Sequence, residues 1–590
     1  MDVVDEESGR SAPLKAEPEG YFSGWIEGSA GLRYRFRLDG EAGLLPDPTS
    51  CFQPDGPHGA SMVVNHRAFA WTDRDWTGVP LERAIIYEMH IGTFTPEGSW
   101  TAATRQLEAL HDLGVTVIEV LPVADFPGRF GWGYDGVNLF APTRLYGDPD
   151  DMRRFVDRAH ALGIAVILDV VYNHFGPDGN YLKQFAPAYF TDRYECEWGK
   201  PPNFDGDDSA PVREFYTANA AYWIDEFHLD GLRLDATQQI FDSSDEHILA
   251  AIGQAARSAA PERTILIVSE NEPQDARLVR AVDEGGYGLD ALWNDDFHHS
   301  AMVALTGRAE AYYSDYRGSA QELLACAKWG FLYQGQRYAW QKQGRGTASL
   351  DLPPPAFINF LQNHDQVANS GKGARGHALS SPGQWRAMTA LLILMPGTPM
   401  LFQGQEFRAS APFLYFADHE PDLARLVEEG RRTFLSQFPS LTLPDVQALL
   451  ASPADPVTFD RCKLDHAERL HGGHAEAWAL HRDLLTLRRE DSALSVLSKR
   501  ELDGATLGEE LFILRYFGGD SGDRLLIVNL GRDRTFDAIA EPLIAPPGSK
   551  RWSLYWSSED SAYGGQGALS PEMDDGRWHL PGPCATLLRS

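Results

Sequence analysis

Between residues 84 and 404 the chain alternates between short apolar runs and longer segments in which apolar positions recur every three or four residues. The apolar runs are nearly continuous, which is typical of parallel strands buried on both faces. The intervening segments, such as 100–114 and 148–163, have the periodicity of amphipathic helices. We predict eight strands, at 84–92, 115–123, 164–171, 229–236, 264–270, 291–295, 357–365 and 398–404.

Eight strands that alternate with helices predict an α/β fold, a (β/α)8 barrel of the triosephosphate-isomerase type. A doubly wound open sheet is the alternative, but so many strands in succession favour closure. Two connections are oversized, one near 175–212 and one near 308–350, and the second contains a predicted helix at 319–331. Connections of that length in a compact domain are usually functional.

Both ends of the chain have a different pattern, in which short strand-like runs are separated by Gly, Pro and Asp. We predict an N-terminal β-sandwich-like domain at 1–76 and a C-terminal β-sandwich at 501–590. The catalytic barrel then occupies 77–500, including its two long connections.

The composition limits the partners and the compartment. The chain has 84 acidic and 52 basic residues, a net charge of −32, which disfavours nucleic acids and anionic membrane surfaces but not a neutral substrate. The five cysteines are scattered and form no CxxC pair, so neither a zinc site nor a disulfide framework is expected. The N-terminal residues lack the basic start and apolar stretch of a signal peptide, and we expect a cytoplasmic protein.

Candidate chemistry is concentrated where the predicted strands end. Because these strand ends meet at one mouth of an α/β barrel, chemically different parts of the sequence should deliver their side chains to a single site. The polar residues at or after the ends of strands two to seven are Tyr134, Asp135, His174, Arg233, Asp235, Glu270, Asp295, Asp296, His298, His299, Asn363, His364 and Asp365.

Taken one at a time, these positions have simpler explanations. An Asp after a strand is more often a helix N-cap, and a His there is more often a structural residue than a ligand. Asp169, which lies inside the third strand, is expected to pair with Arg233. The coincidence of such residues across four different strands is what favours an active site.

The carboxylates among these residues suit the hydrolysis of a glycosidic bond, which needs one ionised carboxyl group and one protonated carboxyl group. Arg233 and Asp235 are two residues apart and share a strand face, so the guanidinium is expected to lower the pKa of Asp235, as a nucleophile requires. Glu270 follows an apolar run, and we expect burial to raise its pKa to about 6, as a general acid requires. Asp365, beside His364, is expected to hold sugar hydroxyls. Metal ligation by the same acids is the rival use, but no ligand spacing supports it.

Four segments resemble the ordered signature regions of the α-amylase superfamily, glycoside hydrolase family 13: DVVYNH (169–174), GLRLDA (231–236), VSEN (268–271) and FLQNHD (360–365). Within that superfamily the chain resembles the maltooligosyltrehalose trehalohydrolase family, from about residue 21 to the C-terminus. The stretches that distinguish this family are YEMHIGTFTPEGSW (87–100), FPGRFGWGYDGVNLFAPTRLYG (126–147), NHFGPDGNYL (173–182), LWNDDFHHS (292–300) and PFLYFADH (412–419).

The resemblance implies a retaining hydrolase that cleaves the α-1,4 bond next to the terminal trehalose of maltooligosyltrehalose, a neutral substrate made by a maltooligosyltrehalose synthase. It implies Asp235 as nucleophile, Glu270 as general acid/base and Asp365 as the third carboxylate, with Tyr134 stacked beneath the sugar. It also implies substrate contacts at the remaining strand-end residues, and Asp295, Asp296, His298 and His299 would help receive trehalose. The family begins with a longer β-sandwich, so a shortened N-terminal domain is expected. Asn173 binds calcium in some relatives, but its partner ligands are missing here, and no metal or cofactor is predicted.

Two rival functions remain open at this point. A glucan branching or debranching enzyme of the same superfamily would use the same three acids, so only the distinguishing stretches separate it from a trehalohydrolase. A barrel without catalytic activity that serves as a glucan-binding scaffold would typically lack one of the acids, whereas Asp235, Glu270 and Asp365 are all present.

Overall fold

The computed structural model describes residues 1–39, 43–495, 501–548 and 550–590. Its centre is a closed parallel barrel in which the strands follow the order β11-β12-β13-β14-β17-β18-β7-β8. The barrel strands are β7 Ile86–Met89, β8 Val117–Val120, β11 Ala165–Val170, β12 Gly231–Leu234, β13 Leu266–Ser269, β14 Ala291–Trp293, β17 Phe357–Phe360 and β18 Thr398–Phe402.

All eight predicted barrel strands are present, and the predicted (β/α)8 fold is confirmed. The eighth strand, β18, pairs in parallel with the first, β7, so the sheet has no free edge and the open-sheet alternative is wrong. Apolar side chains from these strands form a cluster that includes Ile86, Val117 and Met400. Residues two positions along a strand share a face. Glu88 and Glu119 therefore point to the same side of the sheet as Ile86 and Val117.

Several of the helices that surround the barrel begin at a side-chain cap. In α4 the Asp148 side chain accepts from the backbone N–H of Asp151, the Asp151 side chain accepts from the backbone N–H of Asp148, and Pro149 occupies the first turn. The helices are α1 Ile91–Phe94, α2 Trp100–Thr104, α3 Leu107–Leu113, α4 Pro149–Ala161, α5 Leu182–Phe185, α6 Ser209–Glu226, α7 Ile248–Ala259, α8 Asp295–Thr306, α9 Ala320–Trp329, α10 His364–Asn369, α11 Gly376–Leu379, α12 Pro382–Leu394, α13 Pro421–Leu435, α14 Pro444–Gln447, α15 Pro456–Asp460 and α16 Gly472–Glu490.

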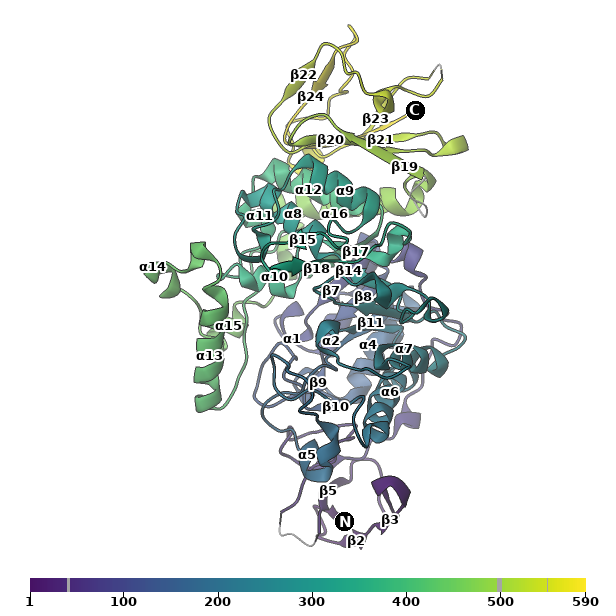
Figure 1. The fold of residues 1–590 in the computed structure, drawn as a ribbon, viewed down its shortest axis with the longest axis vertical. Coiled ribbons are helices and arrows are strands. Elements are labelled where there is room, and N and C mark those ends of the chain that lie inside the picture. The colour runs from purple at the N-terminus through teal and green to yellow at the C-terminus, as the bar shows by residue number, and fades with distance from the viewer. Residues whose placement is uncertain (40–42, 496–500, 549) are drawn as a thin grey trace.

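The N-terminal segment forms a four-stranded antiparallel sheet, in the order β2-β1-β5-β6, and a two-stranded sheet of β3 and β4. Neither β1 nor β2 was predicted, because runs of four and three residues are too short to show a period. Figure 1 shows this part of the chain at the end of the molecule opposite to the C-terminus. The strands are β1 Asp2–Asp5, β2 Ser11–Pro13, β3 Lys15–Ala16, β4 Phe22–Ser23, β5 Arg33–Arg37 and β6 Ser61–Met62.

The two long connections differ in structure. The first contains the short helix α5 and reaches the start of α6, and the second contains α9, which confirms the helix predicted at 319–331. A third excursion was not predicted. It follows β18, includes α13, α14 and α15, and stands out from the side of the barrel (Figure 1). Its amphipathic pattern resembles that of the barrel helices, so the sequence did not distinguish it.

The C-terminal part contains a five-stranded antiparallel sheet in the order β19-β20-β21-β25-β23 and a two-stranded sheet of β22 and β24. Apolar residues from both sheets form one cluster, as in a sandwich. The boundary predicted at residue 500 lies outside the described residues. In the described ranges, no helix is both long and apolar enough to span a bilayer. The strands are β19 Leu502–Thr506, β20 Leu511–Tyr516, β21 Arg524–Asn529, β22 Arg534–Phe536, β23 Ser553–Ser557, β24 Trp578–Leu580 and β25 Cys584–Arg589.

Candidate active site

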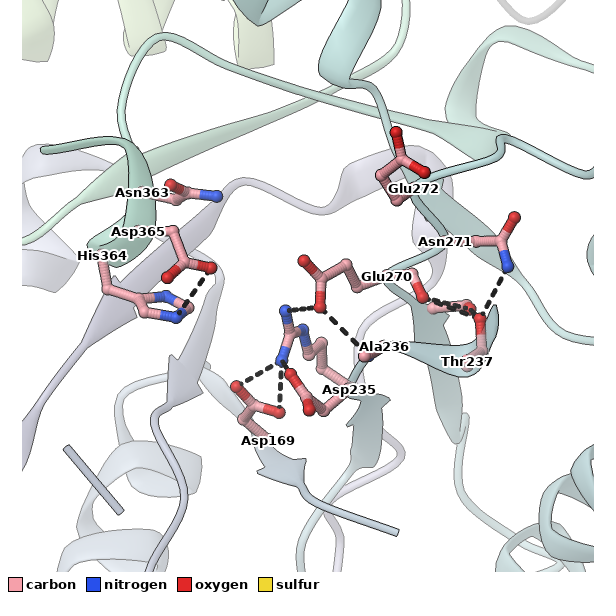
Figure 2. A network of polar contacts seen from close by, with 12 residues as sticks. Asp169, Asp235, Ala236, Thr237, Glu270, Asn271, Glu272, Asn363, His364 and Asp365 are labelled. Carbon is pink, nitrogen blue, oxygen red and sulfur yellow. Dashed lines mark hydrogen bonds and ion pairs between the residues drawn. The ribbon is translucent and has the colours of Figure 1, made fainter. Parts of the chain in front are cut away.

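The barrel strands place polar side chains from three neighbouring strands around one arginine. Asp169 lies in β11, Arg233 lies in β12, and Asp235 and Glu270 directly follow β12 and β13. Figure 2 shows Asp169, Asp235 and Glu270 close together, with the Asp365 carboxylate across from that of Glu270. Segments that are far apart in the sequence thus meet at the mouth, as the strand-end pattern predicts.

Arg233 holds this group together through short ion pairs. Its Nη1 donates to both oxygens of Asp169 at 2.7 Å and to Asp235 Oδ1 at 2.8 Å. Its Nη2 donates to Glu270 Oε2 at 2.8 Å. The guanidinium also lies over the Trp293 ring, 4.1 Å from the centroid. Because one fully buried cation contacts Asp235 and Glu270 together, these two carboxyl groups face the same space.

Asp235 is fixed by a second donor besides the arginine. Asn173 Nδ2 donates to its Oδ2 at 2.8 Å and to its backbone carbonyl at 3.1 Å. Its side chain is 10% exposed, so one edge of the carboxylate is open to a ligand. The expected lowering of its pKa is wrong. Burial raises the pKa of Asp235 by more than Arg233 lowers it, because desolvation penalises the charged form.

Glu270 is held by the chain that follows Asp235. The backbone N–H of Ala236 donates to Glu270 Oε2 at 3.0 Å, and Ala236 has a left-handed conformation with φ +38°. That conformation is costly for a residue with a side chain, and it turns the N–H toward the acid. Burial, and then the charges of Asp235 and Asp365, raise the pKa of Glu270 to about 7 against the opposing effect of Arg233. The direction agrees with the sequence prediction.

Asp365 is the most open of the three acids, with 41% of its side chain exposed. It lies in the first turn of α10, whose N-cap is Asn363; the Asn363 side chain accepts from the backbone N–H of Gln366. His364 Nε2 lies 3.4 Å from Asp365 Oδ2, and His364 Nδ1 donates to Glu88 Oε1 at 2.6 Å. Asn363 thus positions the turn that presents Asp365 to the site.

Tyr134 forms one wall of this space. Its ring is stacked on His364 with 5.1 Å between centroids, and its hydroxyl donates to Asp169 at 2.6 Å. His174 lies behind it, with Nε2 3.1 Å from the Tyr134 carbonyl, and burial lowers its pKa to about 4. Asp135 is partly exposed and lies 3.4 Å from His419.

The acids at the start of α8 have different surroundings. Asp296 is fully buried, and its oxygens accept from Gln274, Tyr316, Arg345 and the backbone N–H groups of Leu332 and Tyr333. Asp295 Oδ2 lies 3.7 Å from Arg345 Nη2. Burial raises the pKa of Asp295 to about 8, since the distant arginine offsets the desolvation only in part.

The two histidines of α8 are buried and neutral. His298 Nδ1 donates to the Leu361 carbonyl at 3.0 Å, and Nε2 lies 3.2 Å from the Tyr313 hydroxyl. His299 is surrounded by the rings of Tyr312, Tyr313 and Tyr316, and within the described residues its Nδ1 has no hydrogen-bond partner. Burial lowers the pKa of both imidazoles, that of His298 to about 3.

The predicted residues thus differ in how far the protein itself occupies them. Asp235, Glu270, Asp365 and Asp135 keep part of their side chains exposed. The polar atoms of Asp296 and His298 are bonded within the protein, as is the Asn363 side-chain oxygen. Arg233, His174 and His364 contact neighbouring groups, Tyr134 stacks on His364, and Asp295 and His299 are buried beside the second cluster. No group of three or more His, Cys, Asp or Glu suited to a metal ion is found among the described residues.

Several charged residues near the site were not singled out from the sequence. Glu88 and Glu119 are buried inside the barrel, and a charged residue within an apolar strand is the signal that could have identified them. Arg345 lies in the second long connection, and Arg431 on α13 stacks over Tyr415. Arg345 and Arg431 lie in a loop and on a helix, where charged residues are common, so the sequence did not distinguish them.

Comparison with protein families gives two matches. The model described as alpha amylase, catalytic domain, matches residues 64–203, and the model described as domain of unknown function DUF3459 matches residues 499–582. A crystal structure described as an alpha amylase from Salmonella typhimurium superposes with a TM-score of 0.87 at 34% identity, covering 100% of this chain and 96% of that chain. The pullulanase type I of Bacillus subtilis, at 19% identity, with a TM-score of 0.71 and 100% of this chain and 82% of that chain covered, shares the fold.

Comparison with curated proteins identifies a narrower family than the domain matches do. The malto-oligosyltrehalose trehalohydrolase of Deinococcus radiodurans is 42% identical over 87% of this chain and 82% of that protein. Its namesake from Saccharolobus solfataricus is 42% identical over 71% of this chain and 74% of that protein. The 1,4-alpha-glucan branching enzyme of Pseudoalteromonas atlantica is only 28% identical, over 68% of this chain and 58% of that protein.

Proposed function

The chain belongs to the malto-oligosyltrehalose trehalohydrolases of the α-amylase superfamily, which are glycoside hydrolases, and on this premise we propose how its barrel mouth performs the reaction. The substrate is maltooligosyltrehalose, the bond cleaved is the α-1,4 bond next to the terminal trehalose, and the products are trehalose and a shortened maltooligosaccharide. A maltooligosyltrehalose synthase supplies the substrate.

One observation supports the mechanism above all others, the single guanidinium that binds both Asp235 and Glu270. Retaining glycosidases need two carboxyl groups close enough for one to attack the anomeric carbon while the other protonates the leaving oxygen. Two carboxyl groups held by the two ends of one guanidinium support such an arrangement, because both lie within hydrogen-bond distance of the same side chain. Inverting enzymes place the two groups farther apart to admit a water molecule.

Asp235 is the nucleophile in this mechanism. Its attack forms a bond to the anomeric carbon and breaks the bond to the trehalose oxygen, which takes the proton of Glu270. The Glu270 carboxylate then accepts a proton from water, and the water oxygen displaces Asp235 and releases the maltooligosaccharide. Because the pKa of Glu270 is about 7, the acid is protonated at lower pH and the first step slows as the pH rises through that value.

The other residues of the mouth bind the sugars. Asp365, whose carboxylate is open to the site, accepts from hydroxyls of the sugar at the cleavage point, and the Tyr134 ring stacks beneath it. On the opposite side, Asp295 and His299 receive the trehalose unit. Asp296 and His298 do not contact the trehalose unit themselves. Their hydrogen bonds to the backbone of Tyr333 and Leu361 fix the chain around that side of the site.

A comparison of two substrates tests this function. The purified protein is offered maltopentaose and maltotriosyltrehalose, which have the same number of glucose units, and the released sugars are identified. Rapid release of trehalose from the second and slow attack on the first is the expected result. Equal rates on both substrates would contradict the trehalohydrolase assignment, and branched products would identify a transferase. Asp235→Asn serves as the inactive control.

A further inference from the structure

Two glutamates lie side by side inside the barrel, below the carboxylates of the mouth. Glu88 on β7 and Glu119 on β8 are register partners in neighbouring parallel strands, and both are fully buried. Burial of a carboxyl group is costly unless the charge is paired or the group is neutral. Each glutamate therefore needs an explanation.

Their surroundings differ sharply. Glu88 Oε1 accepts from His364 Nδ1 at 2.6 Å, and Glu88 Oε2 accepts from the His364 backbone N–H at 3.2 Å. Neither oxygen of Glu119 has a hydrogen-bond partner among the described residues. The same residue type, in the same sheet and at the same level, thus occupies a paired site and an unpaired site.

His364 connects Glu88 to the substrate site. Its ring is fixed between the Tyr134 ring, stacked at 5.1 Å, and the edge of the Trp132 ring, also at 5.1 Å. One ring nitrogen faces Glu88 at 2.6 Å and the other faces Asp365 at 3.4 Å. The contact with Glu88 is a hydrogen bond and the contact with Asp365 is a longer ion pair. An imidazole that is protonated on both nitrogens attracts both carboxylates.

We propose that Glu88 is a positioning residue that keeps His364 as an imidazolium, so that its Nε2–H holds Asp365 in place for the sugar. Glu119 beside it is a neutral carboxylic acid with no part in this contact. The inference rests on the proposed function, in which Asp365 binds the sugar at the cleavage point.

The charges that face His364 support this arrangement. Burial lowers the pKa of His364, but the charges of Asp365 and Glu88 outweigh it and raise the pKa to about 9, against the opposing effect of Arg233. Asp169 and Glu119 are the other acids of this region, and the neutral His90 also lies near. Burial, and then the charge of Glu88, raise the pKa of Glu119 well above its usual value. Glu88, unlike Glu119, has the His364 imidazole as its hydrogen-bond partner.

The pair of glutamates provides a matched test. In Glu88→Gln the amide oxygen still accepts from Nδ1–H, but the charge that favours the imidazolium is lost, and the pKa of His364 falls toward its ordinary value of about 6.5. Trehalose release from maltotriosyltrehalose is measured as kcat/KM at several pH values and divided by the wild-type value. For Glu88→Gln this ratio should fall about tenfold between pH 5.5 and pH 7.5, since a group with a pKa of about 6.5 loses most of its protons over that interval.

Two further variants act as controls. Glu119→Gln replaces one neutral group with another, so its ratio should stay constant with pH. Glu88→Asp keeps the charge, so its ratio should also stay constant, at a reduced kcat. A constant ratio for Glu88→Gln, or the same fall for Glu119→Gln, would overturn the proposal. If Glu88→Gln does not fold, a fall with pH for Glu88→Asp would overturn it as well.

A second measurement separates this inference from the proposed function. A histidine whose pKa is raised by folding stabilises the protein below its unfolded pKa, and that stabilisation is lost as the pH rises through the folded value, here about 9. The unfolding midpoint of the wild type and of Glu88→Asp should therefore fall between pH 7 and pH 10 more steeply than that of Glu88→Gln. Identical slopes would exclude the Glu88–His364 ion pair even if the wild type released no trehalose.

Discussion

Two buried arginines in this protein each contact three carboxylates, yet their surroundings differ. Arg233 meets Asp169, Asp235 and Glu270 at 2.7–2.8 Å. Arg345 meets its three acids over a wider range: Glu272 at 2.7 Å, Asp296 at 3.3 Å and Asp295 at 3.7 Å. Both guanidinium groups also lie over an aromatic ring.

The origin of the carboxylates explains the difference. The acids around Arg233 lie in or directly after barrel strands, which are fixed by their neighbours on both sides. The acids around Arg345 come from the loop after β13 and from the first turn of α8, and Arg345 itself lies in the long connection before β17. The same set of charges therefore makes a tight cluster on strands and a looser one on loops, where burial raises the pKa of Asp295 to about 8.

Removal of a strand-end acid should have the largest effect. Asp235→Asn or Glu270→Gln is expected to lower kcat by about 10³-fold or more, because each removes a group that acts on the reacting bond. Steady-state trehalose release measures the effect, and circular dichroism verifies that the variants fold. Near wild-type turnover in either variant would show that the tight cluster is not the catalytic one.

Replacement of each arginine by lysine should have the next largest effect, and the effect should differ between the two clusters. Arg233→Lys is expected to lower kcat about 100-fold, because a lysine cannot hold Asp235 and Glu270 with the fork geometry of a guanidinium, and small displacements of catalytic groups are costly. Arg345→Lys should act mainly on KM. Steady-state kinetics of the two variants, which give kcat and KM separately, test whether Arg233 affects the reaction step and Arg345 affects substrate binding. Equal losses of kcat would contradict this distinction between the clusters.

Asp296 should matter for stability rather than for the reaction. Asp296→Ala removes five hydrogen-bond acceptor contacts and leaves the buried Arg345 short of a partner. The expected loss is about 3 kcal/mol of the free energy of unfolding, as for other broken buried ion pairs. Denaturant unfolding with Asp296→Asn as the milder control measures it, and a loss below 1 kcal/mol, of the order of an exposed ion pair, would contradict this role.

Asp295→Asn should have the smallest effect. A carboxyl group with a pKa of about 8 is neutral at pH 6, so an amide should change kcat/KM there by less than about threefold. The folded state keeps a proton that the unfolded chain releases above about pH 4, so wild-type stability should fall between pH 4 and pH 8. The variant should lack that slope in its unfolding midpoint. Parallel slopes would place the pKa of Asp295 near its ordinary value.

Much of the fold could be predicted because parallel barrel strands are buried on both faces and therefore read as apolar runs. The meeting of Asp235, Glu270 and Asp365 could be predicted for the same reason, since strand ends share one mouth. The excursion containing α13 to α15 was missed because amphipathic helices look alike wherever they pack. The strands β1 and β2 were missed because they are too short to show a period.

The sequence by itself determined the order of strands and helices and the placement of three acids at strand ends, because these follow from local periodicity and chain order. The pairing of β18 with β7, which closes the barrel, is a property of the folded chain. The tertiary structure decided the protonation states. Neither the net rise in the pKa of Asp235 nor the contrast between Glu88 and Glu119 could be read from neighbouring residues. Both depend on how far water is excluded and which distant charge lies within reach, and only the folded chain sets those distances.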